Sequence, residues 1–339
     1  NIKNLGAKVT QAAKALRSTH RVALSGTPVE NHLGDLYSIL DFIQPGVLGS
    51  PDEFRELYRR PIERHDDAAR MKSLSDRVAP LILRRTKAQV LSELPSKTEI
   101  IVYADLAGRQ RDLYETVRLS MEERVRSALQ NRGFAKSQIV FLDALLKLRQ
   151  VCCDPRLVKL PQASRVTQSA KLEELLLLLE QLLDAGRRVV LFSQFTSMLA
   201  IIARRLDEAR VTHLQLTGRT RDRAAVVEAF SRGEASVFLV SLKAGGSGLN
   251  LTHADTVIHY DPWWNPAVED QASDRVHRLG QTENVTVFKL VCRGSVEERI
   301  LALHAHKRRL ARGAQGGATE HGGRFDLETF EALLRPLDE

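Results

Sequence analysis

Short apolar segments alternate with helix-length segments throughout the second half of the chain. Val189 to Phe192, for example, is apolar at every position and lies between two segments of helical character. Strands of this kind are typical of a parallel sheet, because the connecting helices bury both of its faces. The pattern predicts an α/β fold with strands at 189–192, 211–216, 236–241, 256–260 and 285–291, and helices at 172–183, 196–209, 221–231, 266–276 and 295–310.

The first 155 residues have a different pattern, in which apolar residues recur at the three- and four-residue spacing of helices. A helix at 5–18 and a short strand at 21–24 are expected near its start. Beyond them, Lys97 to Ala104 is the exception that has strand character. The residues at helical spacing include Leu36, Ile39, Leu40 and Ile43, and later Leu142, Leu145, Leu146 and Leu148.

The end of the chain and its cysteines exclude several classes of protein. Residues 313–323 contain five glycines, which predicts a flexible linker before a short helix at 326–334. No apolar run approaches the roughly 20 residues of a membrane span, so no membrane partner is expected. The three cysteines fit neither a disulfide framework nor a zinc site, and a reducing cytoplasm is the simplest setting.

Net charge restricts the class of partner. Fifty Lys and Arg residues against 42 Asp and Glu residues give a net charge of +8. This balance favours an acidic polymer as partner, although a generally basic protein would have the same composition. Two basic clusters could meet a phosphate backbone or form ordinary surface patches: Arg84, Arg85 and Lys87, and then Lys147, Arg149 and Arg156.

A glycine-rich stretch, 241–252, follows the strand expected at 236–241. Glycines at such a place let backbone N–H groups approach a phosphate, and a lysine adds positive charge. The alternative is a tight turn between a strand and a helix that holds no ligand. The residues concerned are Gly245, Gly246 and Gly248, with Lys243 and the polar Ser241, Ser247 and Asn250.

Both tryptophans of the chain, Trp263 and Trp264, follow the strand expected at 256–260. Adjacent side chains of an extended segment point to opposite sides, so at least one indole should face a cleft or a partner. The indoles could stack on bases, or they could pack the loop onto the helix that begins at Pro266. In the second case Asp261 orients the loop and performs no chemistry.

Two arginines, Arg275 and Arg278, lie three positions apart in the helix expected at 266–276 and just beyond it. With Gln271 and Asp274 they would form one polar stripe on a helix face. Guanidinium groups grip phosphate oxygens with a planar fork, so this pair suits the stabilisation of charge in phosphoryl transfer. A solvated face, with Asp274 paired to an arginine, is the alternative, and His277 is expected to be structural. The chain contains no GxxxxGK(S/T) loop to hold a nucleotide.

Six elements in order resemble the SWI/SNF family of helicase-related, DNA-translocating ATPases, which belong to the superfamily-two helicases. They cover roughly residues 1–300. They are Ser25-Gly26-Thr27-Pro28 with Glu30-Asn31, similar to motif III; Leu83 to Lys87 with Leu94 to Lys97, similar to the linker between lobes; Leu148 to Pro155, which precedes the second lobe; Val190 to Phe195, similar to motif IV; Gly245 to Leu251, similar to motif V; and Gln271 to Gln281, similar to motif VI.

The resemblance implies two RecA-like lobes, with ATP and Mg²⁺ between them and double-stranded DNA crossing both. It assigns 1–28 to a remnant of the first lobe, 29–168 to a helical protrusion and linker, 169–312 to the second lobe, and 313–339 to a linker and C-terminal helix. The family's phosphate-binding loop and acidic magnesium motif have no counterpart here. The chain is therefore expected to begin just after the acidic motif and to need the missing N-terminal lobe as a partner.

The resemblance also implies roles for the residues of these motifs. Arg275 and Arg278 would be arginine fingers, and Gln271 would help to position the γ-phosphate. The remaining roles are nucleotide binding by Gly246, Gly248 and Asn250; DNA contact by Ser193, Gln194, Lys243, Ser247, Trp263 and Trp264, with Gly246 and Asn250 as further candidates; and coupling of hydrolysis to DNA by Ser25, Gly26 and Thr27. No metal ligand is expected in this chain.

Three functions remain open on the sequence. The first is the second motor lobe of a DNA-dependent ATPase that remodels protein–DNA complexes in the cytoplasm, nucleoid or nucleus. The second is a module that binds nucleic acid or another partner without hydrolysis, and the third is part of an RNA-directed or polymerase-recycling ATPase. The 339 residues by themselves are expected to be inactive, because they lack the phosphate-binding loop.

Overall fold

The computed structural model describes residues 2–25, 33–65, 67–83, 85, 94–245, 248–313 and 331–337. The chain divides into two compact units. The first comprises residues 1–90 and 305–325, and the second comprises 91–304 and 326–339. Each unit is described by itself.

The first unit contains short helices that share an apolar core. Leu36, Leu40 and Phe54 are at most 2 % exposed and belong to this core. Ser50 starts α3 with a capping box, since its Oγ accepts the N–H of Glu53 and Glu53 Oε2 accepts the N–H of Ser50. The elements are α1 (Lys8–Ala15), α2 (Leu33–Ile43), α3 (Pro51–Phe54), the π-helix η1 (Arg55–Arg59), α4 (Arg60–His65), α5 (Ala68–Val78) and the 3-10 helix η2 (Ala79–Leu81).

The strand expected at 21–24 is not formed. Residues 21–25 have no regular secondary structure, and the side chains of Val22 and Leu24 are 79 % and 97 % exposed. A strand needs hydrogen-bonding neighbours, and the described part of this unit contains no other strand. The helix expected at 5–18 is present but shorter, because it spans only Lys8–Ala15.

The second unit is an α/β domain that begins with a strand and a long helix. Its elements are β1 (Lys97–Ala104), α7 (Gly108–Cys153), the 3-10 helices η3 (Pro155–Leu157) and η4 (Ala163–Arg165), α8 (Ala170–Asp184), β2 (Val189–Ser193), α9 (Thr196–Glu208), β3 (His213–Leu216), α10 (Arg223–Ser231), β4 (Val237–Ser241), α11 (Leu242–Gly245), β5 (Thr256–His259), α12 (Pro266–Ser273), β6 (Val285–Cys292) and α13 (Val296–Gly313), which begins in this unit.

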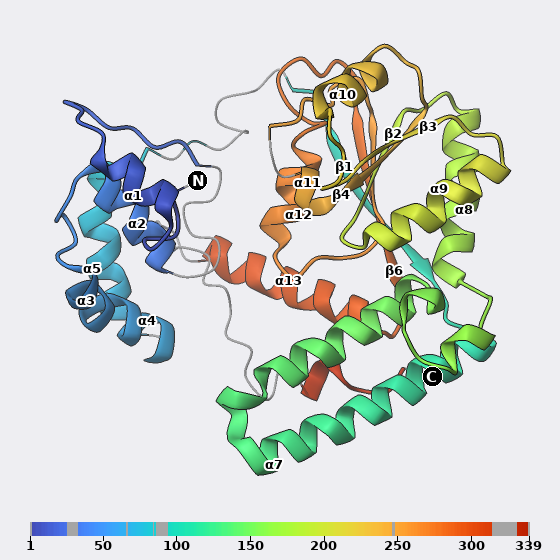
Figure 1. Ribbon diagram of the computed structural model, residues 1–339, viewed down its shortest axis with the longest axis horizontal. Helices are drawn as coiled ribbons and strands as arrows, with labels where there is room; N and C mark the ends of the chain where they lie inside the picture. Colours follow the sequence, from blue (N-terminus) through green and yellow to red (C-terminus); the bar gives the residue numbers. More distant parts are fainter. Residues whose placement is uncertain are drawn as a thin grey trace. The chain divides into compact units, whose positions relative to one another are not determined.

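One six-stranded sheet, in the order β1-β6-β5-β2-β4-β3, lies at the centre of this unit (Figure 1). All neighbouring strands are parallel, which confirms the predicted α/β fold. In the sequence, β1 lies within the mostly helical first 155 residues. In the structure β1 pairs with β6 along its whole length, from Lys97 opposite Val285 to Ala104 opposite Cys292. Pairing across almost 190 residues leaves no local signature in the sequence.

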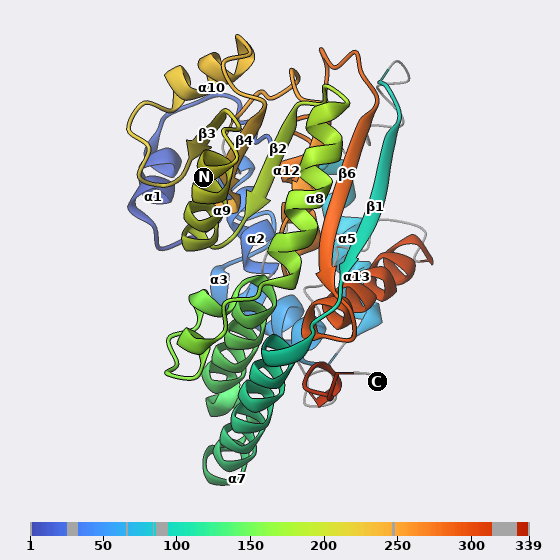
Figure 2. The same cartoon turned by 90° about the vertical axis from the view of Figure 1, so that its right-hand side faces the viewer.

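Different helices cover the two faces of the sheet, because successive side chains of a strand point to opposite sides. Val189 and Leu191 pack on the side of α8 and α9, which Figure 2 shows lying along the sheet. Val190 and Phe192 pack on the other side, with residues of α10, α11 and α12. Every residue of β2, β4 and β5 is buried, as their apolar sequences predicted.

Helix α7 is 46 residues long and folds back on itself, so that two antiparallel arms lie side by side (Figure 1). Gln110 Nε2 near its start donates to the carbonyl of Val151 near its end at 2.9 Å. Further along the arms, Arg124 Nη1 lies 3.4 Å from Asp143 Oδ2. The predicted apolar spacing in the second arm is half right: Leu145 and Leu148 are buried, whereas Leu142 and Leu146 are exposed.

The C-terminal segment at 331–337 packs on α7, where Arg118 Nη1 donates to the carbonyl of Leu334 at 3.2 Å. Its residues 331–333 are helical, and most of the expected linker and helix lies outside the described residues. None of the helices in the described part of the chain is long and apolar enough to cross a membrane.

Candidate nucleotide and nucleic-acid site

The carboxyl ends of β2, β4 and β5 meet at one edge of the sheet, because these three strands are adjacent and parallel. Ligands of open α/β sheets bind outside this edge. Three segments follow these strand ends: 193–195, 260–265, and helix α11 with the described residues 248–252. Apart from the coupling residues, the expected site residues that the structure describes lie at this strand end, on these segments, on α12 or on the turns after α12.

The glycine-rich stretch begins with the short helix α11 and continues as a loop. A Cβ atom on Gly245 would lie 2.8 Å from Cε1 of Phe192, and Gly248 has a φ of +60°. Both glycines therefore have conformational reasons that involve no ligand. Lys243, Gly248 and Asn250 are exposed, whereas Gly246 and Ser247 lie outside the described residues.

The expected helical stripe of four polar residues is wrong, because α12 ends at Ser273. The backbone continues in i to i+3 hydrogen bonds, from the N–H of Arg275 to the carbonyl of Ala272 and from the N–H of Val276 to that of Ser273. Val276 is fully buried in the apolar cluster beneath. Gln271 thus lies on α12, while Arg275 and Arg278 lie on the turns that follow.

These turns are held against the glycine-rich loop. The N–H of Leu251 donates to the carbonyl of Arg275 at 2.9 Å, and Arg278 Nη1 donates to the carbonyl of Leu249 at 3.3 Å. Burial and the positive charge of Arg278 lower the pKa of Arg275, although Asp274 opposes them. The positive charges of the two side chains therefore repel each other, and an anion bound near both would offset this repulsion.

Ser193 does not reach the surface, which corrects its expected role as a DNA contact. Its side chain is buried, and its Oγ donates to Asp261 Oδ1 at 2.5 Å. Asp261 also accepts the N–H of Gln194 at 3.3 Å, so this carboxylate joins the ends of β2 and β5. Burial raises the pKa of Asp261, while Arg149 and Ser193 stabilise its charged form. Asp261 thus orients the loop.

Neither tryptophan is fully buried. The side chain of Trp263 packs against the apolar cluster of the sheet, and its backbone N–H donates to Glu269 Oε1 of α12 at 2.6 Å. Trp264 is also half-buried. At the start of α12, Asn265 Oδ1 accepts the N–H of Ala267, and Pro266 occupies the first turn. The loop is therefore packed onto α12 and keeps part of both indoles accessible.

The second basic cluster is not one surface patch, because Arg149 is buried, whereas Lys147 is half-buried and Arg156 is exposed. The side chain of Arg149 is only 2 % exposed and contacts the loops at the sheet edge. Because basic side chains are rarely buried, no pattern in the sequence indicates that this arginine lies inside the protein. Within the first cluster, Arg85 is exposed, while Arg84 and Lys87 lie outside the described residues.

The residues expected to couple hydrolysis to DNA are Ser25, Gly26 and Thr27. Ser25 is exposed, and Gly26 and Thr27 lie outside the described residues. His277 is structural, as expected, because its Nε2 lies 2.8 Å from the carbonyl oxygen of Pro95.

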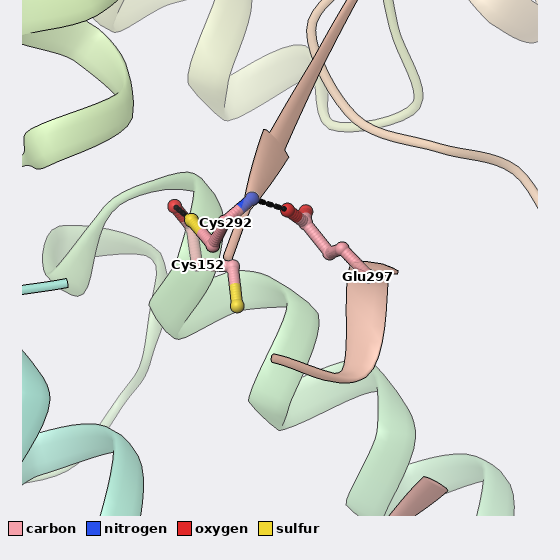
Figure 3. A group of neighbouring side chains, drawn as sticks. All are labelled: Cys152, Cys292 and Glu297. Carbon is pink, nitrogen blue, oxygen red and sulfur yellow. Dashed lines mark hydrogen bonds between the residues drawn. The ribbon is translucent and has the colours of Figure 1, made fainter. Parts of the chain in front are cut away.

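Cys152 and Cys292 lie near Glu297 at the ends of α7 and β6 (Figure 3). One ligand atom of each residue lies within 4.8 Å of the others. Glu297 Oε2 accepts the N–H of Cys292 and forms an ion pair with buried Lys171, while burial raises the pKa of the Cys152 thiol. A metal would have to displace the lysine and deprotonate the thiols, so this cluster is better explained as packing.

Buried His259 should make the stability of the folded protein depend on pH. Burial and the charge of Lys289 lower the pKa of His259 to about 3, and its Nε2 lies 2.8 Å from Ser273 Oγ. The unfolded chain binds the proton near pH 6.5, so the neutral folded form loses stability as the pH falls from 6.5 toward 3, by about 1.4 kcal/mol per pH unit.

We therefore expect His259→Gln to flatten the pH dependence of unfolding over this window. The measurement is urea denaturation of parent and variant at several pH values between about 3 and 8, the range over which such linkage operates. His253→Gln, at an exposed position, controls for the substitution itself. Parallel profiles of parent and His259→Gln would contradict the prediction.

The chain is similar to known helicase-related proteins along most of its length. Residues 1–157 match the SNF2-related domain, and residues 170–280 match the helicase conserved C-terminal domain. An uncharacterized ATP-dependent helicase of Mycoplasma genitalium is 36 % identical over 314 residues, which are 92 % of this chain and 29 % of that protein. A putative ATP-dependent helicase/translocase of Bacillus subtilis is 38 % identical over 307 residues, 88 % of this chain and 33 % of that protein. The chain thus spans about a third of these relatives.

Solved structures agree with this placement. The SWI2/SNF2 ATPase core of Sulfolobus solfataricus in complex with double-stranded DNA is 36 % identical, with a TM-score of 0.53, and the match covers 94 % of this chain and 68 % of that one. The C-terminal domain of the Sulfolobus ATPase matches 71 % of this chain and 99 % of its own, at 29 % identity and a TM-score of 0.56. The chain belongs to the SWI2/SNF2 family of helicase-like ATPases.

Proposed function

We propose that this chain supplies the second motor lobe of a DNA-dependent ATPase that moves along duplex DNA and remodels protein–DNA complexes. The observation that carries the proposal is the arginine pair held against the glycine-rich loop at the ligand-binding edge of the sheet. Family membership supports ATP as the substrate, and the relative solved with double-stranded DNA supports duplex DNA as the partner.

In this proposal Arg275 and Arg278 contact the γ-phosphate of an ATP molecule that is bound mainly by a first lobe. Gln271 lies two residues before the end of α12 and helps to position the phosphate or the closed lobe. Gly246, Gly248 and Asn250 form the adjoining part of the nucleotide site. Mutual repulsion of the guanidinium groups favours anion binding, since burial and Arg278 already lower the pKa of Arg275.

The sheet edge fits the phosphate tail of ATP, because it presents cationic side chains. Mg²⁺ prefers accessible carboxylate oxygens, and the two carboxylates buried among these segments are not accessible. The buried carboxylates here are already bonded, Asp261 to Ser193 and Arg149, and Glu269 to Trp263 and Lys289. We infer that the metal ligands belong to the first lobe and lie outside these residues.

DNA contact is assigned to the exposed Lys243, to Ser247, and to Gln194, Trp263 and Trp264 on the neighbouring loops. Ser193 is not included, because its hydroxyl is buried. Ser25, Gly26 and Thr27 would couple hydrolysis to DNA from the first lobe. Phosphate contacts of this kind carry no base information, so binding is independent of sequence.

The 339 residues alone should bind duplex DNA weakly and hydrolyse no ATP, with or without DNA. With two or three phosphate contacts, affinity should fall by about 10- to 40-fold between about 50 and 200 mM salt. Fluorescence anisotropy of a labelled duplex measures the salt dependence, and phosphate release measures hydrolysis. Robust turnover, or binding that salt does not weaken, would contradict the proposal.

The same salt-dependence assay, applied to a variant of one residue, tests whether DNA contacts Lys243. Lys243→Ala should lower the slope of log affinity against log salt by about one, because one phosphate contact is lost. Lys159→Ala, at another exposed lysine of the same unit, should leave the slope unchanged. Equal slopes for parent and Lys243→Ala would remove this residue from the DNA surface. A labelled RNA duplex in the same assay distinguishes an RNA-directed enzyme.

A further inference from the structure

The guanidinium group of Arg149 lies inside the second unit, in the last turns of α7, and is bonded to both loops that flank it. Its Nη1 donates to Gln194 Oε1 at 3.1 Å, and its Nη2 donates to the carbonyl of Pro262. Nη2 also lies 3.5 Å from Asp261 Oδ2. A planar fork with several donors can hold these acceptors together, which a lysine could not do.

Two aromatic rings complete the environment of this group. The guanidinium carbon lies 6.0 Å from the ring centre of Phe195 and 5.8 Å from that of Trp263. Phe195 follows β2, and Trp263 follows β5, so the rings come from two different loops. Arg149 therefore joins α7 to the two loops that carry Gln194 and the tryptophans.

The loop at 260–265 continues this connection toward the arginine pair. The backbone N–H of Trp263 donates to Oε1 of Glu269, which lies in α12 and is 1 % exposed. Helix α12 ends at Ser273, two residues before Arg275. A displacement of the loop would therefore move the start of α12, and with it the turns that hold Arg275 and Arg278.

Two polar atoms of this cluster are buried without a hydrogen-bond partner. They are Nε of Arg149 and Nε2 of Gln194. An unpaired buried donor costs free energy, and such atoms are rare in native proteins. Both donors lie next to the loops at 193–195 and 260–265, so a shift of either loop changes which acceptors these atoms can reach.

We propose that Arg149 is a positioning residue that couples the loops contacting DNA to the arginine pair through α12. The coupling role depends on the proposed ATPase function, whereas the physical connection from Arg149 to α12 does not. Contact of DNA with Gln194 and the tryptophans shifts the loops, and the buried guanidinium transmits this shift to Trp263, Glu269 and α12. Helix α7 is the fixed support from which Arg149 acts.

The physical connection is tested in the 339-residue chain itself. Arg149→Lys keeps the positive charge but loses the planar guanidinium group. Loss of one charge-assisted hydrogen bond should raise the equilibrium constant for local opening by about tenfold or more. Hydrogen exchange measured by mass spectrometry should therefore speed up by about that factor in 260–278, and much less in 213–231. In a Trp264→Phe background, acrylamide should quench the fluorescence of Trp263 more strongly.

Arg156→Lys is the matched control, because Arg156 lies just beyond the same helix end but its side chain is 45 % exposed and pairs with Asp154. Faster exchange confined to the end of α7, or uniform loosening of the whole unit, would show a merely structural role and overturn the proposal. If Arg149→Lys does not fold, Gln194→Leu removes one acceptor and retains the buried charge, and the same pattern of exchange is expected.

The functional role is tested in a protein that also contains a first lobe. Arg149→Lys should lower kcat in the presence of DNA by about tenfold or more, the factor for one lost charge-assisted bond, with the KM for ATP unchanged. An unchanged kcat would contradict the coupling. If the parent itself shows no DNA-stimulated hydrolysis, the proposed function fails, while the exchange result still decides the physical connection.

Discussion

Arg278→Ala is expected to reduce ATP hydrolysis by about 10³- to 10⁵-fold in a protein that contains both lobes, the usual effect of removing an arginine finger. The physical reason is that charge develops on the transferring phosphoryl group, and a guanidinium stabilises it more in the transition state than in the ground state. Arg278 is half-buried on the turns after α12 and is positioned by its bond to the carbonyl of Leu249.

The measurement is phosphate release at saturating DNA, together with DNA affinity from fluorescence anisotropy. Affinity should stay nearly unchanged, because our proposal places this arginine at the nucleotide and not at the DNA. Arg204→Ala, at an exposed position on α9, is the matched control and should retain activity. Loss of folding in Arg278→Ala, seen in its unfolding curve, would instead identify a structural arginine. A variant that hydrolyses ATP at the parent's rate would exclude the finger.

Lys171→Met is expected to cost about 3–5 kcal/mol in the free energy of unfolding, the usual penalty for breaking a buried ion pair. The side chains of Lys171 and Glu297 are both 0 % exposed and form an ion pair. Burial alone would lower the pKa of Lys171, but Glu297 and the neighbouring cysteines outweigh it and raise this pKa. Without the lysine, the carboxylate of Glu297 would remain buried beside the apolar core.

Urea unfolding followed by tryptophan fluorescence measures this effect, because both tryptophans lie in the same unit as the pair. The double variant Lys171→Met with Glu297→Gln should be less destabilised than the sum of the two single variants, since the uncompensated charge is gone. Lys147→Met breaks the more accessible Lys147–Asp143 pair and should cost about 0.3–0.5 kcal/mol. Additive effects in the double variant would show that the pair is not coupled.

Part of this structure follows from local sequence patterns. The strand predicted at 189–192 extends to Ser193, and the helix predicted at 172–183 spans Ala170–Asp184. Both are long enough, and apolar enough at the right spacing, for local preference and burial to agree. Because local preference and burial agree in these segments, the sequence alone predicts a parallel sheet.

Other features could not be predicted, because distant segments decide them. Helix α12 ends at Ser273, and Val276, three residues further on, is buried in the apolar cluster of the sheet. The strand expected at 21–24 has no neighbouring strand with which to pair among the described residues of its unit. Ser193 and Arg149 are residue types that often contact phosphate, yet both are buried and both contact Asp261.

The sequence by itself determined the parallel α/β fold and the order of the motifs, because these depend on residue types that are close together in the chain. Only the tertiary structure placed Arg275 and Arg278 on turns against the glycine-rich loop, and buried Arg149 between two loops more than 40 residues from it. A charged side chain is buried only where several acceptors converge on it. That convergence arises from three-dimensional packing, which no local pattern of residues records.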